Sequence, residues 1–223
     1  MSKSVRVLLY IDRSHLLNRG IDDYSWFWKF LWQNKEIEHK IPKELRCSHA
    51  ELWFPDDGHY CYGEWKPMFN TPKHLGGKCY GGECFTSTLR DKKENGVVMR
   101  PASQVLTHPE HWCFFEIELT DEEYEAMYEY ALFQASLGIR YSKLTIASFF
   151  LPWRINQKDA DICSEAICRA IYHGLNISDH SLLLSALRKI DVPSPLRLAS
   201  NIFKCGYPLY SLETGKIILE NKV

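Results

Sequence analysis

Alternating hydrophobic and polar positions predict the strands of this chain. The clearest case is residues 47–54, where successive side chains point to opposite faces of a strand. One face carries Ser48, Ala50, Leu52 and Phe54, and the other carries Cys47, His49, Glu51 and Trp53. Similar runs predict further strands at residues 4–11, 83–89, 96–100 and 112–119.

Helical signals gather in the second half of the chain. The run from Thr120 to Glu123 is a capping box and predicts a helix to about residue 137. Another helix is predicted to follow a capping Asp161, to carry Cys163 in its first turn and to end at Gly174. Further helices are expected at residues 24–33, 144–150, 181–189 and 195–203. Strands come first and helices later, so we predict an α+β fold, with a small antiparallel sheet packed on the helix that carries the cysteine.

Length and composition favour one globular domain. The chain has 223 residues, of which 45 % are hydrophobic and 25 % charged. Residues 59–82 are rich in Gly, Tyr, Cys and Lys without a clear period, so we interpret them as an insertion in a single domain spanning residues 1–223.

Charge and hydropathy exclude several classes of protein. Lys and Arg number 27 against 28 Asp and Glu, a balance that argues against a nucleic-acid binder. No apolar run approaches the roughly 20 residues of a membrane-spanning helix. The start shows no cleavage site of a signal peptide, so we expect a cytoplasmic protein whose eight cysteines are free thiols or ligands.

Cys163 and His49 are the candidate reactive pair. A thiol in the first turn of a helix is favoured as thiolate, because backbone N–H groups and the helix dipole stabilise an anion. A strand histidine directed at that turn would serve as its base. Each residue alone has a simpler interpretation, namely a buried structural cysteine and a core histidine.

A zinc site is the competing interpretation of the cysteine-rich insertion. Zinc binds cysteine and histidine, and the candidate ligands are Cys61, His74, Cys79 and Cys84. Their spacing lacks the usual paired two-residue gaps, so we assign no metal and no cofactor. His108 and His111 precede a strand and are interpreted as surface or capping residues.

Several short motifs, taken in order, resemble a known series. They are Ser48-His-Ala-Glu-Leu-Trp-Phe-Pro-Asp, Cys84-Phe-Thr-Ser-Thr-Leu-Arg-Asp, Asn95-Gly-Val-Val-Met-Arg, His111-Trp-Cys-Phe-Phe-Glu-Ile-Glu-Leu, Gly138-Ile-Arg-Tyr-Ser and Ile162-Cys-Ser-Glu-Ala. The chain resembles circularly permuted papain-like proteins of the NlpC superfamily, particularly the YiiX-like branch of bacteria and phages. It is more distantly similar to lecithin retinol acyltransferase. The resemblance covers residues 5–200, with the histidine before the cysteine.

The resemblance implies a permuted papain-like fold, with Cys163 as nucleophile and His49 as general base. The third polar group of this superfamily usually lies on the strand after the histidine, where Thr86 and Ser87 are the candidates. Glu51 competes with them, and we favour it because a carboxylate stabilises the imidazolium. Tyr141 is expected to help wall the pocket.

Three functions remain open at this point. The first is a cysteine-dependent hydrolase, of amidase, peptidase or thioesterase type, or an acyltransferase, acting through an acyl-enzyme on an amide or ester. The second is a catalytically inactive relative that binds a protein or ligand through the aromatic residues 24–32 and the insertion. The third is an interaction protein stapled by zinc. Neither the substrate nor the oligomeric state follows from the sequence.

Overall fold

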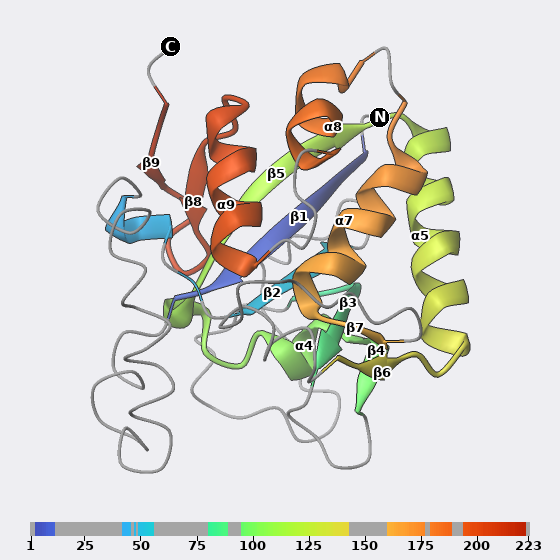
Figure 1. The fold of residues 1–223 in the computed structure, drawn as a ribbon. Helices are drawn as coiled ribbons and strands as arrows, with labels where there is room; N and C mark the ends of the chain where they lie inside the picture. The colour runs from blue at the N-terminus through green and yellow to red at the C-terminus, as the bar shows by residue number, and fades with distance from the viewer. Residues whose placement is uncertain are drawn as a thin grey trace, which may run out of the picture.

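The structure is a computed structural model that describes residues 3–11, 42–45, 47, 49–55, 80–88, 95–142, 160–176, 179–188 and 194–221. The predicted helices at 24–33 and 144–150 lie outside these ranges, as does the predicted insertion except for its last three residues. Figure 1 shows a sheet with helices stacked on one face.

The described residues form an α+β fold around a seven-stranded antiparallel sheet. Its spatial order is β4-β3-β2-β1-β5-β8-β9. Five of these strands were predicted: β1 (Lys3–Tyr10), β2 (His49–Phe54), β3 (Glu83–Thr88), β4 (Gly96–Pro101) and β5 (Trp112–Leu119). The first of them, β1, lies between β2 and β5 and is almost entirely buried.

Four helices cover one face of this sheet (Figure 1). They are α5 (Asp121–Ser136), α7 (Cys163–Gly174), α8 (Ser181–Arg188) and α9 (Pro195–Lys204). The predicted apolar face of β2 meets the predicted apolar face of α7 in one core, formed by Ala50, Leu52, Phe54, Ala166, Ile167, Ala170 and Ile171. Burial of these side chains is the main force that holds α7 on the sheet.

The opposite face of the sheet carries a second, smaller core. It contains Leu8, Trp53, Cys84 and Trp112, together with the short helix α4 (Ala102–Val105). Alternation along β2 therefore divides the strand as predicted, with Leu52 and Trp53 in different cores.

The helix starts differ in how closely they follow the prediction. The capping box of α5 is confirmed, with Thr120 Oγ1 and the Glu123 carboxylate each accepting the other's backbone N–H. The predicted cap of α7 was wrong, because Asp161 lies in a strand and Ile162 takes the N-cap position. The Glu165 side chain takes part of the capping role instead, because its Oε2 accepts the Ile162 N–H at 3.0 Å, while Ile162 itself has no polar side chain.

Gly174 is the last residue of α7 rather than a stop after it. A Cβ atom at this position would lie 2.4 Å from Met127 Cβ on α5, closer than side chains can approach. The absence of a side chain here therefore lets α5 and α7 pack against each other.

Some short elements were not predicted. A hairpin of β8 (Leu209–Ser211) and β9 (Ile217–Leu219) follows the last helix and extends the sheet beyond β5. The strands β6 (Arg140–Tyr141) and β7 (Ala160–Asp161) form a separate parallel pair. The 3-10 helices η1 (Lys43–Leu45) and η2 (Pro109–His111) complete the described elements. The predicted order of strands followed by helices is therefore only approximate, because α4 lies between β4 and β5, β6 and β7 lie between α5 and α7, and β8 and β9 follow α9.

Candidate active site

The candidate pair is assembled where the start of α7 meets the start of β2. Cys163 is the first residue of α7 and His49 the first residue of β2. The helix packs on β2 and β3 through the shared apolar core, which brings its N-terminal turn to the start of β2. Both side chains are buried, Cys163 to 3 % exposure and His49 to 9 %.

The pKa of the Cys163 thiol is lowered, which favours the thiolate form. Burial raises its pKa, but the charge of His49, a hydrogen bond with that ring and hydrogen bonds from backbone N–H groups outweigh burial, and the net pKa is lowered. The two N–H groups belong to Ala50 on β2 and Ser164 in the first turn of α7. The sulfur thus receives backbone donors from both elements, in addition to the imidazole.

The His49 ring is held between the thiol and a carboxylate. Burial lowers its pKa, but the charges and hydrogen bonds of Cys163 and Glu51 outweigh burial and raise the pKa to about 9. Nε2 lies 3.1 Å from Glu51 Oε1. Because a carboxylate accepts, Nε2 carries the hydrogen, and Nδ1 is the nitrogen left for Cys163. The Glu51 side chain therefore bends back along its strand to reach the ring.

Glu51 is also paired with Arg100 of β4. Arg100 Nη2 donates to Glu51 Oε1 at 3.1 Å, so one carboxylate oxygen accepts from both the imidazole and the guanidinium. Glu51 is fully buried. Within the described residues, Glu51 Oε2 and Arg100 Nε are buried polar atoms with no hydrogen-bond partner. The charge of a buried carboxylate must be compensated, and for Glu51 the His49 and Arg100 side chains provide that compensation.

The alternative third groups on β3 are occupied or turned away. The Thr86 hydroxyl is buried and donates to the backbone oxygen of Ala50 at 2.9 Å, which ties β3 to β2. Ser87 follows Thr86 and therefore points to the opposite face of the sheet, the face that carries Phe85 and the helices.

Tyr141 lies beside the thiol. It is in β6, which pairs with β7 directly before α7, and its pKa is raised by burial and by the nearby charges of Cys163 and Glu165. Gly96 on β4 permits this placement, because Val97 N–H donates to Ile139 O at 2.8 Å and a Cβ on Gly96 would lie 2.0 Å from that oxygen.

The neighbouring thiols behave in the opposite way. Burial raises the pKa of Cys168 to about 12, with smaller contributions from Glu165 and Cys163. Burial also raises the pKa of Cys47 and of Cys84 well above the ordinary value. Burial thus keeps these described thiols in the protonated form, whereas the pKa of Cys163 is shifted in the direction that favours thiolate.

The zinc candidates are only partly described. Cys61, His74 and Cys79 lie outside the described residues, as do the aromatic residues 24–32. Cys84 is described and sits in the second core, opposite Trp53 on one side and Arg100 on the other. In the described ranges, one group of side chains brings His and carboxylate donors close enough to share an ion: His108, Glu110 and His111. His108 precedes η2 but makes no side-chain cap.

Arg100 is the residue that sequence reasoning missed. It lies in a strand that was predicted, but its partner is fixed by the pairing of three strands, with Trp53 opposite Cys84 and Cys84 opposite Arg100. The alternation of β4 alone could have placed Arg100 on one of two faces, and only the register places it near Glu51.

No protein-family model, curated protein or solved structure gives a significant match to this chain. Of the helices in the described ranges, none combines the length and apolarity needed to cross a membrane.

Proposed function

We propose that this chain is a cysteine-dependent hydrolase of the circularly permuted papain-like type, which acts on an amide or ester through an acyl-enzyme. The observation that carries the proposal is the contact of Cys163 with His49, in which the thiol pKa is lowered and the imidazole pKa raised despite burial. A lowered thiol pKa and a raised imidazole pKa both favour the thiolate–imidazolium pair, the form in which a cysteine nucleophile attacks.

The first half-reaction forms a thioester. The Cys163 thiolate attacks the carbonyl carbon, a C–S bond forms, and the carbonyl electrons move to oxygen. Backbone N–H groups of the first turn of α7 are the donors we assign to this oxyanion, because they lie beside the attacking sulfur. When the tetrahedral species collapses, the C–N or C–O bond breaks and the leaving group takes the proton of the His49 imidazolium.

The second half-reaction regenerates the thiolate. Neutral His49 accepts a proton from water, the water oxygen attacks the thioester, and the C–S bond breaks to release a carboxylic acid. An acyltransferase would use the hydroxyl or amine of a second substrate at this step in place of water. The residues described here serve both outcomes equally.

Glu51 and Arg100 serve as positioning residues in this scheme. Glu51 Oε1 fixes the tautomer of His49 through Nε2 and stabilises the imidazolium. Arg100 holds the same oxygen at 3.1 Å and compensates the buried carboxylate when His49 is neutral. The carboxylate therefore stays in place through both protonation states of the ring.

The test is the pH dependence of thiol alkylation. Iodoacetamide at limiting concentration should modify Cys163 ahead of the other seven cysteines at pH 7, as read by peptide mass mapping. The acid limb of the rate should lie below pH 9.0, the ordinary thiol value, and a second change should occur near pH 9 as His49 loses its proton. Comparable labelling of all accessible thiols would instead support the inactive binding module.

Acyl transfer itself is tested with activated esters and amides of different acyl groups. Intact mass should show one acyl group added per chain, located on Cys163, followed by its loss in water. Addition of a primary amine or alcohol during the loss separates a hydrolase from an acyltransferase. If Cys163 is alkylated quickly but no ester or amide in the set acylates it, catalysis is not supported.

A further inference from the structure

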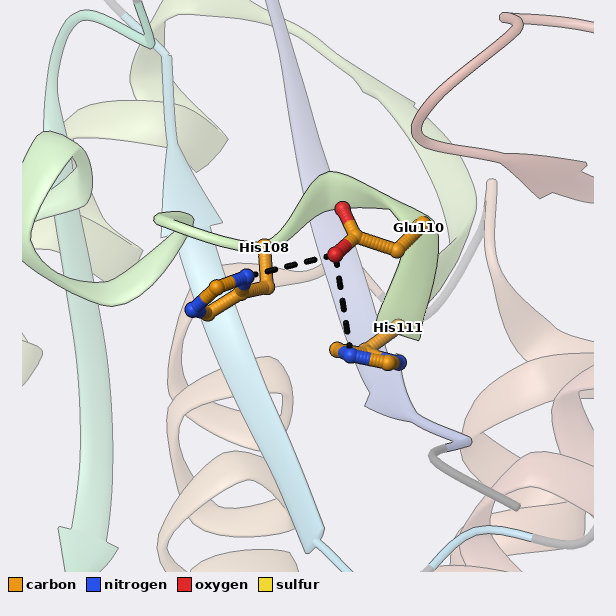
Figure 2. A group of neighbouring side chains, drawn as sticks. All are labelled: His108, Glu110 and His111. Carbon is orange, nitrogen blue, oxygen red and sulfur yellow. Dashed lines mark hydrogen bonds and ion pairs between the residues drawn. The ribbon is translucent and has the colours of Figure 1, made fainter. Parts of the chain in front are cut away.

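A second cluster of polar side chains lies outside the Cys163 site. His108, Glu110 and His111 are next to one another at the turn that precedes β5, and all three are solvent-accessible. Figure 2 shows both imidazoles directed at one carboxylate oxygen of Glu110. The donor atoms of the three side chains lie within 4.8 Å of one another.

The distances in this cluster suit a metal ion. Glu110 Oε1 lies 3.2 Å from His108 Nδ1 and 3.6 Å from His111 Nε2. Ligands at about 2.0–2.2 Å around a tetrahedral ion are about 3.3–3.6 Å apart, and these two distances are close to that spacing. The third distance is the one between the two imidazole nitrogens. The His108 side chain is 59 % exposed, so its ring can rotate and bring the two nitrogens to the same spacing.

The donor set also has a chemical preference. Two imidazoles and one carboxylate with open positions are the ligands of catalytic zinc sites and of mononuclear iron sites. Calcium and magnesium prefer oxygen ligands, so this set selects a transition-metal cation over them.

The backbone holds the three residues in place without a metal. His111 N–H donates to His108 O at 3.0 Å and closes the turn, and Pro109 starts η2. His111 O accepts the N–H of Ile11 at 2.8 Å, which ties the turn to the end of β1. A ligand set on a fixed turn loses little conformational entropy when an ion binds.

The cluster lies at the same end of the sheet as the candidate active site. His49 pairs with Tyr10, and Tyr10 pairs with Trp112, the residue after His111. Neighbouring strands are about 4.8 Å apart, so the backbones of His49 and Trp112 are separated by roughly 10 Å.

We propose that His108, Glu110 and His111 form a binding site for a single divalent transition-metal cation of the zinc class. The site is independent of the function proposed for Cys163. It differs from the cysteine-rich zinc site considered from the sequence, because its ligands are nitrogen and oxygen atoms only.

Cobalt(II) is the probe for this site. Titration of the full chain should saturate at one Co²⁺ per chain, with visible ligand-field absorption and without the near-ultraviolet charge-transfer band of a cobalt–thiolate bond. Added Zn²⁺ should displace the cobalt. A charge-transfer band at unit stoichiometry would assign the metal to cysteines and overturn the proposal.

Three variants locate the metal. His111→Ala and Glu110→Gln should each weaken Co²⁺ binding by about tenfold or more, since each removes one of three protein ligands. His173→Ala is the matched control, because His173 is an exposed histidine on α7, stacked on Tyr130 and outside the cluster. It should bind Co²⁺ as the wild type does.

Circular dichroism of the metal-free variants should match the wild type, because the side chains that are changed lie on the surface. Equal Co²⁺ affinity in wild type, His111→Ala and Glu110→Gln would overturn the proposal, as would a wild-type chain that binds no Co²⁺ at millimolar concentration.

Discussion

Two turns of the same helix hold cysteines whose pKa values are shifted in opposite directions. Cys163 begins α7 and Cys168 lies five residues further along, and both are buried, to 3 % and 8 % exposure. Burial raises the pKa of each thiol. For Cys168 it prevails and the pKa reaches about 12, whereas for Cys163 the net pKa falls below the ordinary value.

The difference lies in the partners rather than in the helix. Cys163 has the His49 ring and two backbone N–H donors, while the groups that affect Cys168 are negative, namely Glu165 and Cys163 itself. A helix start does not by itself make a thiol reactive. The strand that meets the helix end supplies the cation, and its distance from the second turn leaves Cys168 inert.

Replacing the sulfur of each cysteine in turn should produce the largest difference in alkylation rate. Cys163→Ser should remove the fast alkylation, and Cys168→Ser should leave its rate within about twofold of the wild type. The replaced atom is similar in size in both variants, so packing is matched. Fast alkylation that survives in Cys163→Ser would place the reactive thiol elsewhere in the chain.

Removal of the imidazole should have the next largest effect. In His49→Ala burial is left as the dominant influence on Cys163, so the thiol pKa should rise above 9.0 toward the behaviour of Cys168. Each unit by which the thiol pKa rises lowers the thiolate fraction, and with it the alkylation rate at pH 7, by about tenfold. The rate against pH measures this directly.

The stability of His49→Ala separates two interpretations of that residue. A ring that serves the site should leave the fold intact, as measured by urea unfolding. A loss of about 2–5 kcal/mol, typical of a cavity in the core, would support a structural histidine instead.

Variants of Glu51 and Arg100 should have intermediate effects on the alkylation of Cys163. Glu51→Gln should slow alkylation at pH 7 by roughly tenfold, less than loss of the triad carboxylate in serine enzymes, because Cys163 still stabilises the imidazolium. Arg100→Met should slow it by a smaller factor, and should add little in a Glu51→Gln background if Arg100 acts through the carboxylate.

Thr86→Val is the control for this pair of variants. The Thr86 hydroxyl donates to Ala50 O, so its loss should leave the pH profile unchanged. A profile that moves with Thr86→Val but not with Glu51→Gln would transfer the orienting role to β3. Independent effects of Glu51→Gln and Arg100→Met would show that Arg100 acts by another route.

The smallest effect is expected at the far end of α7. Gly174→Ala should lower stability by about 1 kcal/mol net, because crowding against Met127 outweighs the better helix propensity of alanine. The site is eleven residues away, about 16 Å along the helix, so alkylation of Cys163 should not change. A more stable variant would mean that α5 and α7 are not in close contact at this point.

Local pattern was sufficient to predict the central strands and two faces of β2. Alternation placed Leu52 and Phe54 toward the helices and Trp53 away from them, as the two cores confirm. The capping box at Thr120 was also predictable, since both of its partners lie within four residues. The permuted papain-like assignment remains a prediction, resting on the order of the motifs.

Features that depend on distant partners were not predictable. At the start of α7, Glu165 rather than Asp161 accepts a backbone N–H, because Asp161 is held in β7. The β9 strand was missed because it has three residues, and Ile217 and Ile218 are exposed and give no alternation. Arg100 required the register of three strands.

The order of the two partners along the chain has a consequence during protein synthesis. His49 precedes Cys163 by 114 residues (163 − 49), so a ribosome adding about 5–20 residues per second makes the cysteine roughly 6–23 s later. Until α7 emerges and docks on β2, the newly made thiol has no imidazole beside it and keeps an ordinary pKa. If Cys163 is the nucleophile that we propose, its thiol therefore becomes reactive only after α7 has docked on β2.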